Sequence, residues 1–313
     1  VMLARVLRLA LLIEMVLYMA IASYGLAASP SAAAGLALAG VLSLRAALIT
    51  LTYGYAWVYH SPAPRLSVRQ TVLMVLGEYT AMLLSFVVIF PFERWWMGTD
   101  RLQASIANAV GTPGRRLPVL LVHGYFCSRA AWWWLRRRLE AAGWTVATIS
   151  LEPIHGSIED YVAPLARRID AVLAETGAER VLLAGHSMGG LVARAYLQGC
   201  GHARVAGLVT LGTPHQGSHL ARIGPGRNAR QMRPGNPWLQ NLANPAAVLD
   251  TLAIYSPHDN FVMPQSHSQL PGAANEPIDD LGHLAMLYSP RVAQALLSAF
   301  DRMDTRSRQA PRV

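Results

Sequence analysis

The stretch VLLAGHSMGGLVARA, residues 181–195, constrains the fold of this chain more than any other. A short apolar run over 181–184 predicts a buried strand, and residues 191–197 have the apolar spacing of a helix. Between them, GHSMG matches the pattern G-x-S-x-G, with Ser187 at its centre. Small neighbours let the strand and the helix pass close together, which places the serine at the tip of a strained turn. Because the N-terminus of the helix favours negative charge, the stretch predicts an activated serine.

The first 92 residues contain three long apolar runs. The chain is 53% hydrophobic and only 14% charged, and the excess of apolar residues lies in this region. The runs cover residues 9–28, 35–58 and 71–92, and each is long enough to cross a bilayer. We therefore predict about three transmembrane helices within residues 1–92. A cleaved signal peptide is the alternative for the first run, since Ala-Ala-Ser at 27–29 resembles a cleavage site.

Each run also contains one charged residue, which is costly inside a membrane. These residues are Glu14, Arg45 and Glu78. We expect them to pair with one another in a small bundle or to reach toward the membrane surface. A relay or a ligand site is the alternative interpretation.

The placement of arginine predicts the topology. Arg5 and Arg8 precede the first run, and Arg65 and Arg69 lie between the second and third runs. The connection between the first two runs has no charge. Since positive residues favour the cytoplasmic side, three crossings place the chain beyond the third run outside the cytoplasm. If residues 35–58 do not cross, that part moves to the cytoplasmic side.

Beyond the apolar runs, the pattern changes to strands that alternate with helices. We expect a linker over residues 93–116, an α/β domain over 117–302 and a disordered tail over 303–313. Alternating elements of this kind predict a mainly parallel sheet flanked by helices. Strands are predicted at 117–122, 145–151, 180–184, 205–211 and 252–256, and helices at 130–142, 158–175, 188–198 and 290–301.

Charge and cysteine content limit the partners. All 27 basic residues are arginine, and the formal net charge of +9 suits an anionic membrane surface. Nucleic acid is not expected as a partner, because the arginines are scattered and no recognition motif accompanies them. The two cysteines, Cys127 and Cys200, can form a disulfide only if the fold brings them together. The sequence does not indicate an oligomeric state.

A serine nucleophile needs a base, and the base needs an acid that orients it. After a strand–serine–helix turn of this kind, the acid and then the histidine follow along the chain. Asp259 comes shortly after the predicted strand 252–256, which is the right end for the acid. Asp250 precedes that strand, and Asp279 and Asp280 remain the alternatives.

The base is expected in a later loop, before the last helix. His283 follows a glycine and stands shortly before the predicted helix that begins at Pro290. His258 and His267 are the competitors. His258 is adjacent to the predicted acid and would point away from it, and His267 comes early in a loop rich in proline and serine.

A tetrahedral intermediate also needs two backbone donors for its oxyanion. One is the amide of Met188, directly after the serine. The other comes from the loop after the first buried strand, where Gly124 allows a close turn and the amide of Tyr125 becomes a donor. Phe126 replaces it if the turn is shifted by one residue. His123 is expected to brace this loop.

These segments together resemble a known family. LLVHGYF, AGHSMGG, LGTPHQGS, YSPHDNFV and the later GHL are similar to bacterial triacylglycerol lipases and esterases of the α/β-hydrolase superfamily. The resemblance covers residues 117–300 and implies hydrolysis of carboxylic esters, with Ser187, Asp259 and His283 at the matching positions. The first 92 residues have no counterpart in the secreted lipases, and this departure suggests a membrane-tethered enzyme. Together with the predicted topology, it gives the expected location: a multi-pass protein of the bacterial inner membrane with a periplasmic catalytic domain.

The expected activity is that of a membrane-anchored serine hydrolase that cleaves esters with apolar acyl chains through an acyl-enzyme. An acyltransferase or a thioesterase with the same triad is the alternative, and a non-catalytic membrane scaffold or transport protein is a third reading that the intact triad disfavours. We see no metal-ligand cluster or phosphate-binding loop and expect no cofactor. Residues 215–250 form either a surface loop or an apolar wall or lid, to which Ile223, Met232, Trp238 and Leu239 would contribute.

Overall fold

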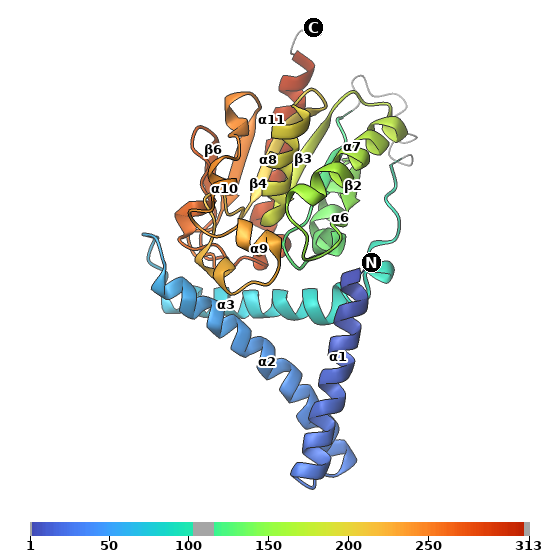
Figure 1. The fold of residues 1–313 in the computed structure, drawn as a ribbon, viewed down its shortest axis with the longest axis vertical. Helices are drawn as coiled ribbons and strands as arrows, with labels where there is room; N and C mark the ends of the chain where they lie inside the picture. The colour runs from blue at the N-terminus through green and yellow to red at the C-terminus, as the bar shows by residue number, and fades with distance from the viewer. Residues whose placement is uncertain (1, 103–115, 310–313) are drawn as a thin grey trace.

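The computed structural model describes residues 2–102 and 116–309 and has two parts (Figure 1). Three long helices lie at the base of an α/β domain. The domain contains a six-stranded sheet in the order β2-β1-β3-β4-β5-β6, in which all neighbouring strands are parallel. The strands are β1 (Val119–Val122), β2 (Val146–Ile149), β3 (Val181–His186), β4 (Val205–Leu211), β5 (Thr251–Tyr255) and β6 (Ala274–Pro277).

Both faces of the sheet are buried, as a parallel sheet requires. Leu121 of β1 packs into one apolar cluster, whereas its neighbours Leu120 and Val122 pack into another on the opposite face, because side chains alternate along a strand. One cluster includes residues of α6 (Trp133–Ala141) and α11 (Pro290–Gln309), and the other includes residues of α7 (Val162–Thr176) and α8 (Met188–Cys200). The predicted parallel sheet flanked by helices is thus confirmed.

Short helices fill the connections of the domain. They are α4 (Glu93–Met97), η3 (Arg129–Trp132), η4 (Glu159–Tyr161), η5 (His219–Arg222), α9 (Arg227–Gln231), α10 (Pro237–Gln240), η6 (Pro245–Ala247), η7 (Gln265–Ser268) and η8 (Ala285–Tyr288). Several begin with a side-chain cap; at α10, the Asn236 side chain accepts a hydrogen bond from the amide of Trp238. The segments after β4 and β5 carry most of these short helices.

Two details of the predicted boundaries change. The five predicted strands are present, but β6 was not predicted, because this edge strand is short and largely exposed. The prediction of a disordered tail from residue 303 is wrong as far as residue 309, where α11 ends. Met303 is buried over Gly207, whose missing side chain leaves it room, and the Asp304 carboxylate accepts a hydrogen bond from the Leu117 amide at 2.9 Å. The end of the predicted tail, 310–313, lies outside the described residues.

The first part of the predicted linker is attached to the domain. Asp100 is almost fully buried, and its carboxylate accepts a hydrogen bond from the amide of Thr148 in β2 at 2.7 Å. It also pairs with Arg129, Arg136 and Arg168. Residues 103–115, which make up most of the linker prediction, lie outside the described residues.

The three predicted apolar helices are present, and each is long and apolar enough to cross a membrane. They are α1 (Met2–Ala20) with its continuation η1 (Ile21–Gly25), α2 (Pro30–Val58), and α3 (Val68–Leu83) with its continuation η2 (Leu84–Ile89). A capping box starts α3, in which Ser67 and Gln70 each bond the backbone of the other. In Figure 1, α1 and α2 extend away from the domain and meet at their far ends, whereas α3 lies across its base.

The contacts of these helices conflict with the predicted topology. The backbone nitrogen of Met2 donates to the Glu152 carboxylate at 2.5 Å, and Leu3 is buried in a core cluster of the α/β domain. At the other end of the region, Phe90, just after η2, belongs to the same cluster. In the structure the N-terminus therefore contacts the α/β domain, which differs from the prediction that three crossings separate the two.

The charged residues of the helices pair differently from the prediction. Arg45 of α2 and Glu14 of α1 form an ion pair, as expected. Glu78 of α3 does not join them, because it is fully buried against the α/β domain. Its contacts belong to the site described next.

Candidate active site

Ser187 stands on the sharp turn between β3 and α8. Its backbone has φ 55° and ψ −127°, which is strained for a residue with a side chain. The surrounding glycines make the turn possible: a Cβ atom at Gly185 would overlap the backbone of Gly190, and one at Gly189 would overlap the carbonyl of Val122. The sequence GHSMGG therefore folds into the strained serine turn that its pattern predicts.

A second loop approaches the serine closely. A Cβ atom at Gly124 would lie only 2.7 Å from the Cβ of Ser187, so that glycine sets the distance between the loop after β1 and the serine. Tyr125 follows it, and its hydroxyl donates to the carbonyl of Pro225 at 2.5 Å. Met188 is the first residue of α8, so its amide has no partner within the helix. The two predicted oxyanion donors thus belong to the two segments of the chain that meet at Ser187.

His123 lies under this loop. Its Nε2 accepts a hydrogen bond from the amide of Leu151 at 2.8 Å, and its Nδ1 donates to the carbonyl of Gly124 at 2.9 Å. Burial lowers its pKa to about 4, so the ring is neutral at physiological pH. These contacts agree with the bracing role that the sequence predicted.

Asp259 and His283 form a buried pair. His283 Nδ1 lies 2.7 Å from Asp259 Oδ2, and both residues are almost fully buried. The other carboxylate oxygen accepts hydrogen bonds from the amides of Phe261 at 2.7 Å and Val262 at 2.9 Å. With Nδ1–H donating to the carboxylate, Nε2 is left to act as a base. Burial alone lowers the pKa of His283, but the charge and hydrogen bond of Asp259 outweigh it, and the pKa is raised.

The competing residues have other partners. His258 Nε2 lies 2.9 Å from the carbonyl of Pro64, and His267 Nδ1 lies 3.0 Å from the carbonyl of Gly217. Asp250 pairs with Arg306, Asp280 pairs with Arg291, and the carbonyl of Asp279 accepts from the same arginine. The structure thus brings His283 together with Asp259 and not with the alternatives.

Glu78 holds the loop that carries the histidine, which the sequence did not predict. Its two carboxylate oxygens accept hydrogen bonds from the amides of Leu284 at 3.0 Å and Ala285 at 2.8 Å. Two accepted N–H groups, one on each oxygen, stabilise the ionised form of the carboxylate. A Cβ atom at Gly282 would overlap this carboxylate, so the glycine before His283 is required by the close approach of α3.

Helix α2 contacts the same loop through a short hydrogen-bonded chain. The amide of His283 donates to Asn260 Oδ1 at 3.0 Å, and Asn260 Nδ2 donates to Thr52 Oγ1 at 2.8 Å. The ring of Phe261 stacks on the imidazole with their centroids 5.1 Å apart. The histidine is therefore held by residues from α2, from α3 and from the loop after β5.

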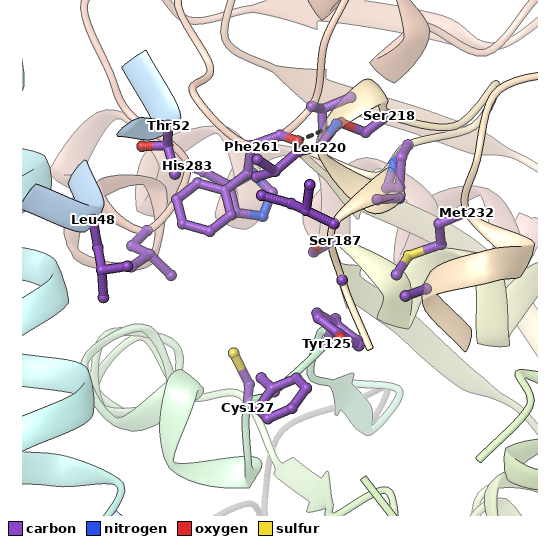
Figure 2. A pocket seen from close by; sticks show the side chains of 18 of the residues that line it. Leu48, Thr52, Tyr125, Cys127, Ser187, Ser218, Leu220, Met232, Phe261 and His283 are labelled. Atoms are coloured by element: carbon purple, nitrogen blue, oxygen red, sulfur yellow. Dashed lines mark hydrogen bonds between the residues drawn. The ribbon is translucent and has the colours of Figure 1, made fainter. Parts of the chain in front are cut away.

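Ser187 and His283 face a common apolar cavity of about 310 Å³ (Figure 2). Residues 218–232 form one wall, and two of the four apolar residues singled out in this segment, Ile223 and Met232, line the cavity. Leu239 and Trp238 pack instead against the core of the domain. The rest of the lining comes from the loop after β1, the loop after β5, and helices α2 and α3, which contribute Leu48, Leu51, Thr52 and Met82, with Phe86 from η2.

The cysteines are both free. Cys127 lines the cavity and is buried, which raises the pKa of its thiol to about 12, whereas Cys200 at the end of α8 is exposed. No disulfide links them. Within residues 2–102 and 116–309, no group of three or more His, Cys, Asp or Glu side chains could hold a metal ion.

Comparison with known proteins identifies the class. A family model described as the alpha/beta hydrolase family matches residues 119–308, and the chain belongs to this family. Two triacylglycerol lipases, from Pseudarthrobacter phenanthrenivorans and Burkholderia plantarii, are each 36% identical to it in an alignment of 118 residues, which covers 34% of this chain. That segment spans 35% and 32%, about a third, of these two relatives.

Solved structures show the same fold. The mature form of a Bacillus licheniformis lipase matches with a TM-score of 0.54 at 18% identity, over 61% of this chain and 96% of that one. Aspergillus fumigatus lipase B matches with a TM-score of 0.52 at 17% identity, over 59% and 52% of the two chains. At these identities the likeness concerns the fold of the α/β domain.

Proposed function

We propose that the protein is a membrane-anchored serine hydrolase, a lipase or esterase that cleaves carboxylic esters with apolar acyl chains. One observation carries the proposal: a strained serine and a histidine bonded to a buried aspartate face the same apolar cavity. The polar groups supply the chemistry of acyl transfer, and the apolar walls suit a hydrocarbon chain. The likeness to triacylglycerol lipases supports the same substrate class.

In the proposed mechanism, Ser187 Oγ attacks the ester carbonyl while His283 Nε2 takes its proton. The amides of Tyr125 and Met188 stabilise the oxyanion that forms. His283 then gives the proton to the leaving alkoxide, and an acyl-enzyme remains on Ser187. Asp259 keeps the imidazole oriented and stabilises its positive charge during both transfers.

The second half repeats these steps with water. His283 takes a proton from a water molecule, whose oxygen attacks the acyl carbonyl. The tetrahedral intermediate collapses, the carboxylic acid leaves, and the proton returns to Ser187. Each half thus forms one C–O bond and breaks one, with His283 carrying the proton.

We further propose that the hairpin of α1 and α2 crosses a bacterial inner membrane and that the catalytic domain lies in the cytoplasm. Arg5, Arg8, Arg65 and Arg69 lie at the domain end of these helices, and positive residues favour the cytoplasmic side. Two free cysteines, one of them exposed, also suit a reducing compartment. This proposal replaces the periplasmic placement predicted from three crossings.

Hydrolysis of p-nitrophenyl esters of increasing acyl length tests the proposed activity. The detergent-solubilised full chain is compared with Ser187→Ala, which keeps the fold and removes only the hydroxyl. We expect the wild type to cleave the esters and the variant to lose activity by more than about 10⁴-fold. A maximum at long chains would identify a lipase and one at short chains an esterase, whereas equal inactivity of both proteins would rule out ester hydrolysis.

The native cysteine Cys200 tests the orientation. A membrane-impermeant maleimide is applied to intact spheroplasts and to lysed membranes, and the variant Ser29→Cys, in the exposed connection between α1 and α2, serves as the control. We expect Cys200 to react only after lysis and the introduced thiol of the control variant to react in both preparations. Labelling of Cys200 in intact spheroplasts would place the domain outside the cytoplasm.

A further inference from the structure

One wall of the cavity does not belong to the α/β domain. Leu48 and Leu51 of α2, Met82 of α3 and Phe86 of η2 line the space beside Ser187. The same helices are long and apolar enough to cross a membrane. The cavity is therefore composed of two parts of the chain that the sequence had assigned to separate functions, catalysis and anchoring.

The helices are fixed to the site rather than only resting near it. Thr52 accepts a hydrogen bond from Asn260, which in turn binds the backbone of His283. At the end of α2, the ring of Tyr59 stacks on His219 with their centroids 4.2 Å apart. Because both contacts join α2 to loops of the α/β domain, they set which of its side chains face the cavity.

The rim of the cavity is apolar on the side of α2. Leu48 and Leu51 line the cavity and are nevertheless 41% and 47% exposed, and Ile223, on the wall formed by residues 218–232, is 54% exposed. Leucines farther along α2, such as Leu44, are exposed as well. Side chains that line a cavity and also face outward mark its opening, and here the opening joins the apolar outer surface of the helix.

We infer that α2 and α3 form part of the acyl-binding site and that the ester enters this site laterally from the bilayer. This inference rests on the proposed function and adds to it the source of the substrate, a membrane-resident lipid with a long acyl chain. A hydrocarbon chain that moves from the bilayer along Leu48 and Leu51 to Ser187 passes a mostly apolar surface, whereas entry from water requires the chain to be hydrated first.

The test compares hydrolysis of an ester in the bilayer that holds the enzyme with hydrolysis of the same ester in a separate bilayer. The full chain is reconstituted in vesicles of a dialkyl-ether phosphatidylcholine, which has no carboxylic ester to cleave, and dioleoylglycerol is placed either in the same vesicles or in separate ones. We expect rapid release of oleate only when enzyme and ester share a bilayer. Equal initial rates in the two arrangements would overturn lateral entry.

Substitutions at the rim test the acyl wall. Leu51→Trp narrows the opening from α2 and Met82→Trp fills the wall from α3. The control, Leu38→Trp, adds the same side chain at an exposed position of α2 that does not line the cavity. We expect the first two to lower the rate on dioleoylglycerol at least tenfold more than the rate on p-nitrophenyl acetate, and the third to leave the ratio of these rates unchanged. An unchanged ratio in both rim variants would contradict the assignment.

The failure of this inference can be told from failure of the proposed function. If the wild type cleaves p-nitrophenyl esters but not dioleoylglycerol in its own bilayer, the enzyme is a hydrolase and lateral entry is wrong. If the wild type cleaves neither ester, the proposed function itself is wrong and the inference falls with it.

Discussion

Replacing Glu78 by glutamine removes one of the two acceptors that hold the loop after His283. The carboxylate accepts hydrogen bonds from the amides of Leu284 and Ala285 and is fully buried. Glutamine keeps one oxygen and turns an NH2 group toward the second amide, so that two donors face each other. A hydrogen bond to a charged group contributes roughly 1.5–3 kcal/mol, so we take about 2 kcal/mol as the loss.

That free energy sets an upper limit for the effect on catalysis. If all of it served to position His283, kcat would fall about 30-fold, since 1.36 kcal/mol corresponds to a factor of ten. The part that stabilises only the fold lowers the melting temperature instead. We expect a fall in kcat with KM for a short soluble ester little changed, because Glu78 does not line the cavity.

The assay compares kcat, KM and the melting temperature of Glu78→Gln with those of Glu14→Gln. Glu14 is also an acidic residue of an apolar helix, but its partner is Arg45 and not the histidine loop. The pH dependence of kcat/KM adds a readout that a change in stability does not affect. The negative charge of Glu78 contributes to the raised pKa of His283, so the apparent pKa of the rate should be lower in Glu78→Gln. Equal kcat values in the two variants, with unchanged pH profiles, would refute a positioning role.

Three further predictions concern the site itself. Because the pKa of His283 is raised and only the neutral ring acts as a base, kcat/KM should fall with decreasing pH through an apparent pKa above the ordinary value of about 6.5. Asp259→Asn should lower this apparent pKa, and an unchanged value would contradict the assignment of Asp259 as the acid. Gly124→Ala places a Cβ 2.7 Å from that of Ser187 and should lower kcat by roughly 10²-fold in the ester assay. A variant with the kcat of the wild type would show that the loop after β1 is not held close to the serine. In the folded protein, maleimide should modify Cys200 and spare buried Cys127, which peptide mass spectrometry can check; rapid modification of both would mean that the cavity is open to the reagent.

The α/β domain was predictable because its local signals agree with one another. The glycines around Ser187 allow neighbouring segments to approach closely, and the structure places each of them against neighbouring backbone or side chains. Asp259 and His283 were found from their order along the chain and their positions after a strand and before a helix. The structure places His283 Nδ1 2.7 Å from Asp259 Oδ2.

The errors arose where tertiary contacts outweigh local pattern. The helix α11 continues to Gln309 because Met303 fills the space over Gly207, a partner far away in the sequence. The apolar pattern of α3 did not predict its contacts with the α/β domain, since hydropathy does not distinguish lipid from a protein surface as the neighbour of a helix. Glu78 was recognised as costly in an apolar helix, but its partners are backbone amides, which leave no mark in the sequence.

Covalent labelling tests the central claim, that Ser187 is an activated nucleophile, most directly. The solubilised chain and its Ser187→Ala variant are treated with a fluorophosphonate, which reacts with serines activated by a neighbouring base, and the modified peptide is identified by mass spectrometry. We predict one adduct on the peptide that contains Ser187 and none in the variant. An unlabelled wild type, or an adduct that persists in the variant, would contradict the proposed active site.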